Sequence, residues 1–311
     1  MRVLITGAGG FIGSHVVRNV LRDGHTVIAV LRPGESGERL SDCLDSVSLF
    51  RCDLYDGDAV RKLVAEAQPE KALHLAWYVE TGKYWQSREN LDCVRMSLSL
   101  AQALAEAGCS RFVGAGTCAE YDWNHGLLTE DATPLRPQSL YGICKNATRE
   151  ILEAFCAQVK MGFAWTRIFL LYGPMESKER LVPYVVLTLL RGEVANCTPG
   201  EQMRDFLYVE DAASAIWAVA KSDLCGPVNV GSGQAIKVRT LVETVARYLQ
   251  REENLALGAL PSDPQEPPLV SADVHRLATV VGWKASHTLA EGVAKTCEWW
   301  RSRYLSNIDG P

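Results

Sequence analysis

Close to its start the chain reads Ile5-Thr6-Gly7-Ala8-Gly9-Gly10-Phe11-Ile12-Gly13, and this glycine-rich stretch decides the fold. It follows residues 2–5, an apolar run typical of a buried strand. It precedes residues 11–21, whose apolar positions recur with helical spacing. A strand, a tight turn and a helix in this order form the context that a dinucleotide site requires.

The three spaced glycines of this loop have separate expected roles. Gly7 allows the turn, Gly10 lets a pyrophosphate approach the backbone, and Gly13 permits close packing of the helix on the strand. Free amide groups at the start of the helix attract phosphates. An ordinary strand-to-helix turn is the alternative, but the position of the loop directly behind the first strand favours cofactor binding.

A second motif, Tyr141-Gly142-Ile143-Cys144-Lys145, lies within residues 139–159, which have helical spacing and few helix breakers. Tyrosine and lysine four positions apart share one helical face. A nearby ammonium favours the phenolate, so we expect Lys145 to lower the Tyr141 pKa from its usual value of about 10. Two solvated side chains are the alternative. Together with the glycine loop, the pair predicts nicotinamide chemistry on a carbonyl.

Composition narrows the class of protein. The 311 residues are 47% hydrophobic, enough for a large core, and carry a formal net charge of −5 without a basic tract. We therefore expect neither nucleic acid nor an anionic membrane as a partner. Apolar stretches are too short to cross a bilayer and Met1 leads straight into a strand, so we expect a cytoplasmic protein. The ten cysteines are scattered, which predicts neither disulfides nor a metal site.

Strand-like and helical segments alternate up to about Phe169, the pattern of a parallel sheet covered on both faces. After Tyr172-Gly173-Pro174 the alternation lapses and prolines mark loops among shorter elements. We predict an α/β fold with a doubly wound parallel sheet and a smaller lobe in the second half of the chain.

The sequence resembles the extended short-chain dehydrogenase/reductase superfamily, in the branch that acts on nucleotide sugars. Besides the two motifs above, the resemblance rests on segments that occur in the family's order and spacing along nearly the whole chain. These are Cys52-Asp53-Leu54, His74-Leu75-Ala76-Trp77, 116–121 (GTCAEY), 167–174 (RIFLLYGP), 204–213 (RDFLYVEDAA), 228–233 (VNVGSG) and Val281-Gly282-Trp283.

The resemblance implies two interleaved lobes. Residues 1–173 with about 204–231 would form the dinucleotide-binding domain, because 204–230 would return to the main sheet. About 174–203 and 232–311 would form the substrate lobe. The helix expected over 87–108 would pair with the Tyr141 helix in a homodimer; an ordinary core-facing helix is the alternative.

The resemblance also implies roles for individual residues. Tyr141 would exchange a proton with the sugar oxygen, Thr117 would hold that oxygen, and Lys145 would tune the tyrosine and bind the nicotinamide ribose. His74 is interpreted as a structural histidine. The expected cofactor-binding residues are Gly7, Gly10, Phe11, Ile12, Gly13, Arg32, Asp53, Leu54, Leu75, Ala76, Trp77, Tyr141 and Lys145.

Departures from the family pattern restrict the reaction. Sugar-nucleotide 4,6-dehydratases carry an acid and a base directly after the threonine, and this chain has Cys118-Ala119 there. Glu120 comes one position too late and should point elsewhere. We therefore expect no 4,6-dehydratase. Cys118 is interpreted as a buried inert thiol rather than an epimerising base.

The residue at the end of the second strand indicates whether such an enzyme binds NAD or NADP. NAD enzymes usually carry an acidic residue there, and this chain has Leu31 followed by Arg32. Arg32 could meet a 2′-phosphate, so we expect NADP, with NAD as the alternative.

The substrate is expected to be a nucleotide sugar. Arg204 would bind the diphosphate through bidentate bonds. Leu170 stands where relatives often have asparagine, which shifts the expected contacts toward backbone amides near Leu181. The expected substrate-binding residues are Thr117, Cys118, Ala119, Leu181, Arg204 and Asp205.

The leading hypothesis is an NADPH-dependent reductase of a keto group on a nucleotide-linked deoxysugar, most simply at C4, with Tyr141 as the acid. A nucleotide-sugar 4-epimerase with bound NAD is the runner-up. A non-catalytic dinucleotide-sensing module is the alternative from another class, although the intact Thr117, Tyr141 and Lys145 set argues against it.

Overall fold

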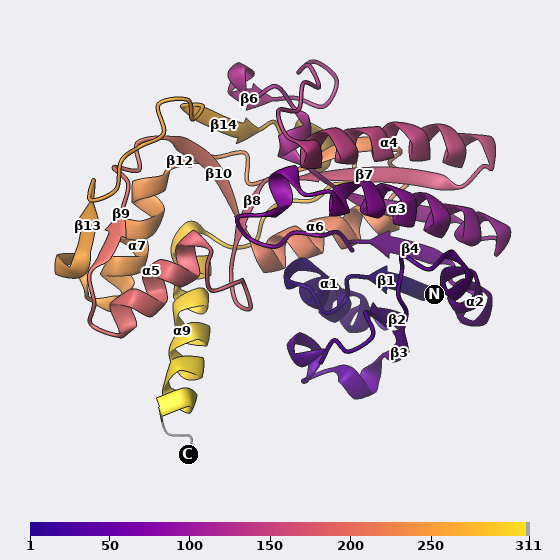
Figure 1. The fold of residues 1–311 in the computed structure, drawn as a ribbon, viewed down its shortest axis with the longest axis horizontal. Helices are drawn as coiled ribbons and strands as arrows, with labels where there is room; N and C mark the ends of the chain where they lie inside the picture. The colour runs from indigo at the N-terminus through magenta and orange to yellow at the C-terminus, as the bar shows by residue number, and fades with distance from the viewer. Residues whose placement is uncertain (309–311) are drawn as a thin grey trace.

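The computed structural model describes residues 1–308 and places a seven-stranded parallel sheet at the centre of the larger lobe (Figure 1). The strands follow the order β11 (Gly226–Val230), β7 (Gly162–Ile168), β5 (Arg111–Thr117), β4 (Lys71–His74), β1 (Arg2–Thr6), β2 (Thr26–Leu31) and β3 (Ser48–Arg51). Because β1 lies between β2 and β4, the direction of winding reverses there. Ligands of such sheets bind at the carboxyl ends of the strands at this point.

Helices cover both faces of the sheet, so the expected doubly wound α/β fold is confirmed. On one face α1 (Phe11–Arg22) and α6 (Val209–Lys221) pack against each other and against alternate strand residues. The other face carries α2 (Gly57–Ala67), α3 (Glu89–Glu106) and α4 (Leu140–Gln158). Alternation along β1 fits this arrangement, because Val3 and Ile5 face the first layer and Leu4 the second.

The smaller lobe is built around a second, mixed sheet. Its strands are β6 (Leu127–Leu128), β8 (Leu170–Tyr172), β10 (Met203–Tyr208), β12 (Ala235–Lys237) and β14 (Leu269–Ala272), with β10 in the middle. A parallel pair, β9 (Ala195–Cys197) and β13 (Leu255–Leu257), lies beside it. Three helices, α5 (Leu181–Leu190), α7 (Val238–Leu249) and α9 (Leu289–Ile308), pack around a separate core at the left of Figure 1.

The boundaries between the lobes differ from the expected ones. Residues 204–208 belong to β10, which pairs with β8, β12 and β14 and not with the main sheet. The return to the main sheet is made by α6 and β11. Conversely, α8 (His275–Thr279) lies against β11, and its Leu277 is buried in the main core. The local sequence does not determine these strand pairings, because each strand pairs with strands that are far away in the chain.

Candidate active site

The glycine loop has the geometry expected of a dinucleotide cradle. Gly7 adopts a φ of +66°, and a Cβ at this position would lie 2.9 Å from the Ala76 nitrogen at the end of β4. Gly13 lets α1 approach the loop, since a Cβ there would lie 2.0 Å from the Gly7 carbonyl oxygen. Helix α1 begins directly after Gly10, and its first amides are aimed away from the helix body. The residues therefore fit a bound dinucleotide pyrophosphate.

The residues expected along the cofactor channel lie at the same edge of the sheet. Asp53 follows β3 and is exposed, whereas Leu54 is buried. Leu75, Ala76 and Trp77 follow β4 next to Gly7 and are partly buried.

His74 is a structural residue, as expected. Its two ring nitrogens contact the hydroxyls of Thr6 and Ser97 at 2.7 and 2.8 Å. Burial lowers the His74 pKa to about 3, with the Lys145 charge adding to this effect, so the ring stays neutral at physiological pH.

The catalytic candidates come together at the ends of β5 and α4. The Ser139 hydroxyl caps α4 by accepting a hydrogen bond from the Gly142 nitrogen at 3.1 Å. Gly142 also lets α4 lie against the turn that follows Thr117, because a Cβ there would be 2.4 Å from the Ala119 carbonyl oxygen. This packing brings Tyr141 close to the end of β5, where Thr117 lies. Both side chains are buried.

Lys145 lies one turn further along α4 and is almost fully buried. Its Nζ donates a hydrogen bond to the Ala115 carbonyl oxygen at 2.7 Å and lies 3.8 Å from the ring centre of Trp77. The Tyr141 ring centre is 5.9 Å from the same Nζ. The predicted convergence of the two side chains on one helical face is thus present.

The pKa of Tyr141 corrects the sequence-based expectation. Burial is the dominant influence and raises this pKa, with a further rise from Tyr84 and an opposing hydrogen bond from Thr117. Burial likewise lowers the Lys145 pKa to about 7. Desolvation disfavours the charge on both groups, so it outweighs the expected lowering of the tyrosine pKa by the ammonium.

An aromatic wall that the sequence interpretation missed surrounds Tyr141. The rings of Tyr84 and Trp85 meet its ring edge-on at centroid distances of 4.9 and 5.7 Å. Arg180, which precedes α5, lies 5.6 Å from the Tyr84 ring centre and so links this wall to the smaller lobe. The sequence contains Trp77, Tyr84 and Trp85, but no periodic pattern connects these aromatic residues with Tyr141.

The residues after Thr117 form the short 3₁₀ turn η4 (Cys118–Glu120). Cys118 and Ala119 are buried, and burial raises the Cys118 pKa to about 12, in keeping with an inert thiol. Glu120 points away from Tyr141, as expected. Its carboxylate accepts hydrogen bonds from the Thr117 nitrogen and from Arg167, at 2.9 and 2.8 Å.

The structure changes the interpretation of Asp205. Its carboxylate is fully buried and accepts hydrogen bonds from Ser232, Gly233 and Ala272 nitrogens at 2.7, 2.9 and 3.1 Å. These bonds tie β10 to neighbouring segments of the smaller lobe, so Asp205 is a structural residue and not the expected substrate contact. An Arg-Asp pair in sequence could not reveal that both side chains are buried.

Arg204 is also engaged, since its Nη2 lies 2.6 Å from Glu266 Oε1 on the proline-rich loop before β14. A diphosphate would therefore compete with Glu266 for this guanidinium.

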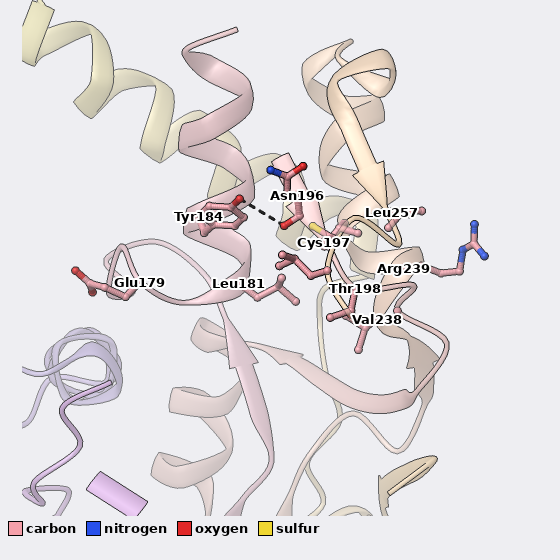
Figure 2. Close-up of a pocket in the computed structure, with 12 residues that line it drawn as sticks. Glu179, Leu181, Tyr184, Asn196, Cys197, Thr198, Val238, Arg239 and Leu257 are labelled. Carbon is pink, nitrogen blue, oxygen red and sulfur yellow. Dashed lines mark hydrogen bonds between the residues drawn. The ribbon is translucent and has the colours of Figure 1, made fainter. Parts of the chain in front are cut away.

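A cavity of about 250 Å³ opens in the smaller lobe between α5, β9, α7 and β13 (Figure 2). Leu181 points into it beside Cys197 and Thr198, while the Arg239 side chain extends outward. Tyr184 donates a hydrogen bond to the Asn196 carbonyl oxygen at 3.4 Å at the rim. Leu181 is thus placed at a cavity, whereas the remaining lining residues were not predicted, because they come from four separate elements.

The expected absences can be compared with the described part of the chain. All ten cysteines are free. Within residues 1–308 no cluster of three or more His, Cys, Asp or Glu side chains is placed to hold a metal ion. No helix among these residues is both long and apolar enough to cross a membrane.

On the β2 side of the loop, the structure reveals an acidic residue that the sequence interpretation missed. Leu31 is buried and Arg32 is exposed, as a strand end followed by a loop would predict. Glu35, however, folds back so that its Oε2 accepts a hydrogen bond from the Arg32 nitrogen at 3.1 Å. A carboxylate therefore lies beside the cradle, although the usual acidic position is occupied by leucine.

Comparisons with known proteins agree with this geometry. A model of the NAD dependent epimerase/dehydratase family matches residues 3–231. The chain is 28% identical to dTDP-glucose 4,6-dehydratase 1 of Escherichia coli, over 99% of this chain and 93% of that protein. It is 29% identical to UDP-glucose 4-epimerase of Mycolicibacterium smegmatis, over 97% of this chain and 99% of that protein.

A solved structure gives the same result. MoeE5 in complex with UDP-glucose and NAD is 30% identical, superposes with a TM-score of 0.83, and covers 98% of this chain and 100% of that one. The hypothesis of a non-catalytic sensor therefore loses its support. The chain belongs to the NAD dependent epimerase/dehydratase family and is an enzyme of the extended short-chain dehydrogenase/reductase type.

Proposed function

We propose that this enzyme is a nucleotide-sugar 4-epimerase that retains NAD. The observation that carries the proposal is that Thr117, Tyr141 and Lys145 are buried together where α4 packs on the end of β5, with no acid or base in the two positions after the threonine. Such a set supports oxidation and reduction at one sugar carbon. Elimination of water would require a further acid and base, and Cys118 and Ala119 supply neither at neutral pH.

Tyr141 is the group that exchanges a proton with the sugar hydroxyl or carbonyl oxygen. Because burial raises its pKa, the phenol is protonated at rest and suits the reduction half of the reaction, in which it donates its proton to the carbonyl oxygen. In the oxidation half, Tyr141 would first pass its proton to neutral Lys145, and the phenolate would then accept the proton of the sugar hydroxyl. Thr117 holds the same oxygen from the other side. Lys145, with a pKa lowered to about 7, can take up or release a proton near neutrality within the same buried site. A dinucleotide held at the glycine loop would supply the hydride acceptor for oxidation at C4 and the hydride donor for the opposite face of the keto sugar.

The cavity at Leu181 fits the base of the nucleotide. It is lined mainly by apolar side chains, and the carbonyl group of Asn196 lies at its rim. Arg180 lies between this cavity and Tyr84, so a diphosphate that linked base and sugar would pass this cation on its way to Tyr141. Arg204 is a second candidate for the diphosphate.

Retention of the cofactor is supported by a bridge between the two lobes. Arg39 donates a hydrogen bond to the Gly9 carbonyl oxygen at 3.3 Å and another to the Met175 carbonyl oxygen at 2.9 Å. His15 contacts the Pro174 carbonyl oxygen at 3.2 Å. These contacts join the segment after β8 to the glycine loop, and they would hinder release of a dinucleotide bound at that loop. Retention of the reduced cofactor suits an epimerase, because the keto sugar must be reduced again before it leaves the site.

The NADPH-dependent reductase of a 4-keto sugar is the second candidate. Arg32 favours it, because this exposed guanidinium follows β2 and forms no ion pair within residues 1–308. Arginine at this position suits a 2′-phosphate. We also propose a cytoplasmic homodimer joined through α3 and α4, where Leu91, Ile143 and Ile151 are exposed.

The test begins with freshly purified protein, from which the dinucleotide is released by denaturation and identified by mass spectrometry. The native enzyme is then incubated with UDP-glucose or dTDP-glucose without added cofactor, and the C4 configuration is followed by NMR. The proposal expects about one NAD per chain and formation of the C4 epimer. An empty protein that oxidises NADPH in the presence of a nucleotide-linked 4-keto sugar would establish the reductase instead.

Variant proteins sharpen this test. Tyr141→Phe should lower turnover by about 100- to 10,000-fold while NAD stays bound. Tyr248→Phe is the matched control, because its hydroxyl donates to Glu298 at 2.8 Å between α7 and α9, away from the catalytic set.

A further inference from the structure

We infer that the Glu35 carboxylate binds the hydroxyls of the adenosine ribose and makes the enzyme prefer NAD over NADP. The inference deepens the proposed function and rests on its dinucleotide site, although not on the identity of the sugar. It assigns to Glu35 the work usually done by an acidic residue at the end of the second strand, where this chain has Leu31.

The local sequence builds a tight turn that brings Glu35 back toward the glycine loop. In Arg32-Pro33-Gly34-Glu35 the proline fixes the first central position, and Gly34 adopts a φ of +81° at the second. The Glu35 nitrogen donates to the Arg32 carbonyl oxygen at 3.1 Å and closes the turn. Arg51, at the end of β3, donates to the Glu35 carbonyl oxygen at 2.6 Å and fixes the turn from the other side.

The carboxylate lies against the glycine loop. A Cβ built on Gly9 would lie 2.3 Å from Glu35 Oε1 and 2.9 Å from Leu31 Cδ2, so the acid lies directly against this glycine and a side chain there would push it aside. Glu35 Oε2 is held by the Arg32 nitrogen, whereas Oε1 has no hydrogen-bond partner within residues 1–308. Its remaining lone pairs are available to hydroxyl donors.

The charges around this carboxylate show why it is available to a ligand. Arg39 donates to the Gly9 carbonyl oxygen and Arg51 to the Glu35 carbonyl oxygen, so both cations bind backbone oxygens and not the acid. Glu35 forms no ion pair in the described part of the chain, and it is half-buried. A carboxylate fixed by its own turn accepts two neighbouring ribose hydroxyls and repels a phosphate at the 2′ position.

Equilibrium binding tests this assignment without any sugar substrate. The full-length protein is treated with charcoal to remove resident dinucleotide and is titrated with NADH and with NADPH, with ligand fluorescence as the readout. Wild type should bind NADH more tightly. Glu35→Gln keeps the size of the side chain and should weaken NADH binding by about 10- to 100-fold. It should also reduce the difference in affinity between NADH and NADPH. Asp45→Asn, an equal charge change on an exposed residue of the same β2–β3 connection, should leave both affinities unchanged.

The results that would contradict the Glu35 assignment differ from those that would contradict the proposed reaction. Preference of the wild type for NADPH, or NADH affinity of Glu35→Gln within twofold of wild type, would overturn the inference. Glu35→Asp provides a second variant, since it keeps the charge but shortens the reach, and it should weaken NADH while still disfavouring NADPH. A protein that shows these binding results but forms no C4 epimer would contradict the proposed reaction and leave the Glu35 assignment standing.

Discussion

Arg167 and Glu120 form an ion pair that is buried inside the protein directly behind Thr117. Arg167 Nε lies 2.8 Å from Glu120 Oε2, and the side chains are 1% and 0% exposed. The other carboxylate oxygen accepts hydrogen bonds from the Trp165 indole at 2.8 Å and from the Thr117 nitrogen. Glu120 therefore fixes the backbone that carries Thr117 and takes no part as an acid in the site.

Removal of the Glu120 charge should destabilise the folded protein. Glu120→Gln leaves the Arg167 charge buried without a counterion, and we expect the free energy of unfolding in urea to fall by about 3–5 kcal/mol. Glu193→Gln breaks an exposed pair with Arg191 and should cost less than about 1 kcal/mol. Equal losses in the two variants would show that the buried pair does not support the site.

Gly13 should tolerate no side chain. Because a Cβ would lie 2.0 Å from the Gly7 carbonyl oxygen, Gly13→Ala must push α1 away from the loop, and we expect NADH affinity to fall by at least about tenfold. Gly57→Ala is the control, since the nearest heavy atom would be 3.8 Å from the new methyl group. Circular dichroism checks that both variants fold. Unchanged NADH binding by folded Gly13→Ala would contradict the packing role.

His74 should make the protein sensitive to mild acid. The folded-state pKa of about 3 lies below the unfolded value of about 6.5, so below pH 6.5 the unfolded chain binds a proton that the folded chain does not. Stability from this group is present above pH 6.5 and is lost as the pH falls toward 3. Between pH 7.5 and 5.0 we expect a loss of about 2 kcal/mol from His74 alone.

Urea unfolding at the two pH values measures this contribution by comparison with His74→Asn. The variant should be less stable at pH 7.5, because the Thr6 and Ser97 hydroxyls lose a fitted partner, but it should lose about 2 kcal/mol less on acidification. An identical pH dependence in both proteins would mean that His74 titrates normally.

The exposed apolar residues of α4 should hold two chains together. Ile143 and Ile151 are 51% and 47% exposed and lie about two helical turns apart on one face. The double variant Ile143→Lys/Ile151→Lys should sediment as a monomer in analytical ultracentrifugation, with its urea midpoint within about 0.5 M of wild type. Val280→Lys, at a position that is 59% exposed on another surface, should remain dimeric. A monomeric wild type would refute the proposed dimer.

Features that depend on nearby residues were predictable from sequence. The roles of Gly7 and Gly13 and the shared face of Tyr141 and Lys145 follow from turn and helix geometry. The sequence also predicted that Glu120 points away from the site, because it stands one position later than the acid and base of the 4,6-dehydratase pattern.

Features that depend on distant partners were not predictable in this way. The place of Asp205 is fixed by amides on two other segments, and the Tyr141 pKa is governed by burial behind aromatic rings from elsewhere in the chain. Glu35 was missed for a different reason. Its position follows from a local proline-glycine turn, but the acidic residue was sought only at the end of β2.

The mixed sheet of the smaller lobe has a consequence for synthesis on the ribosome. Strand β6 pairs with β14 through Leu128 and Ala272, so its partner emerges long after it does. The first parallel strands and their helices can associate as they leave the exit tunnel, since their contacts are close in sequence. The smaller lobe must wait until almost the entire chain has been translated. A nascent chain stalled before Ala272 would therefore carry a formed glycine loop but an unfinished smaller lobe.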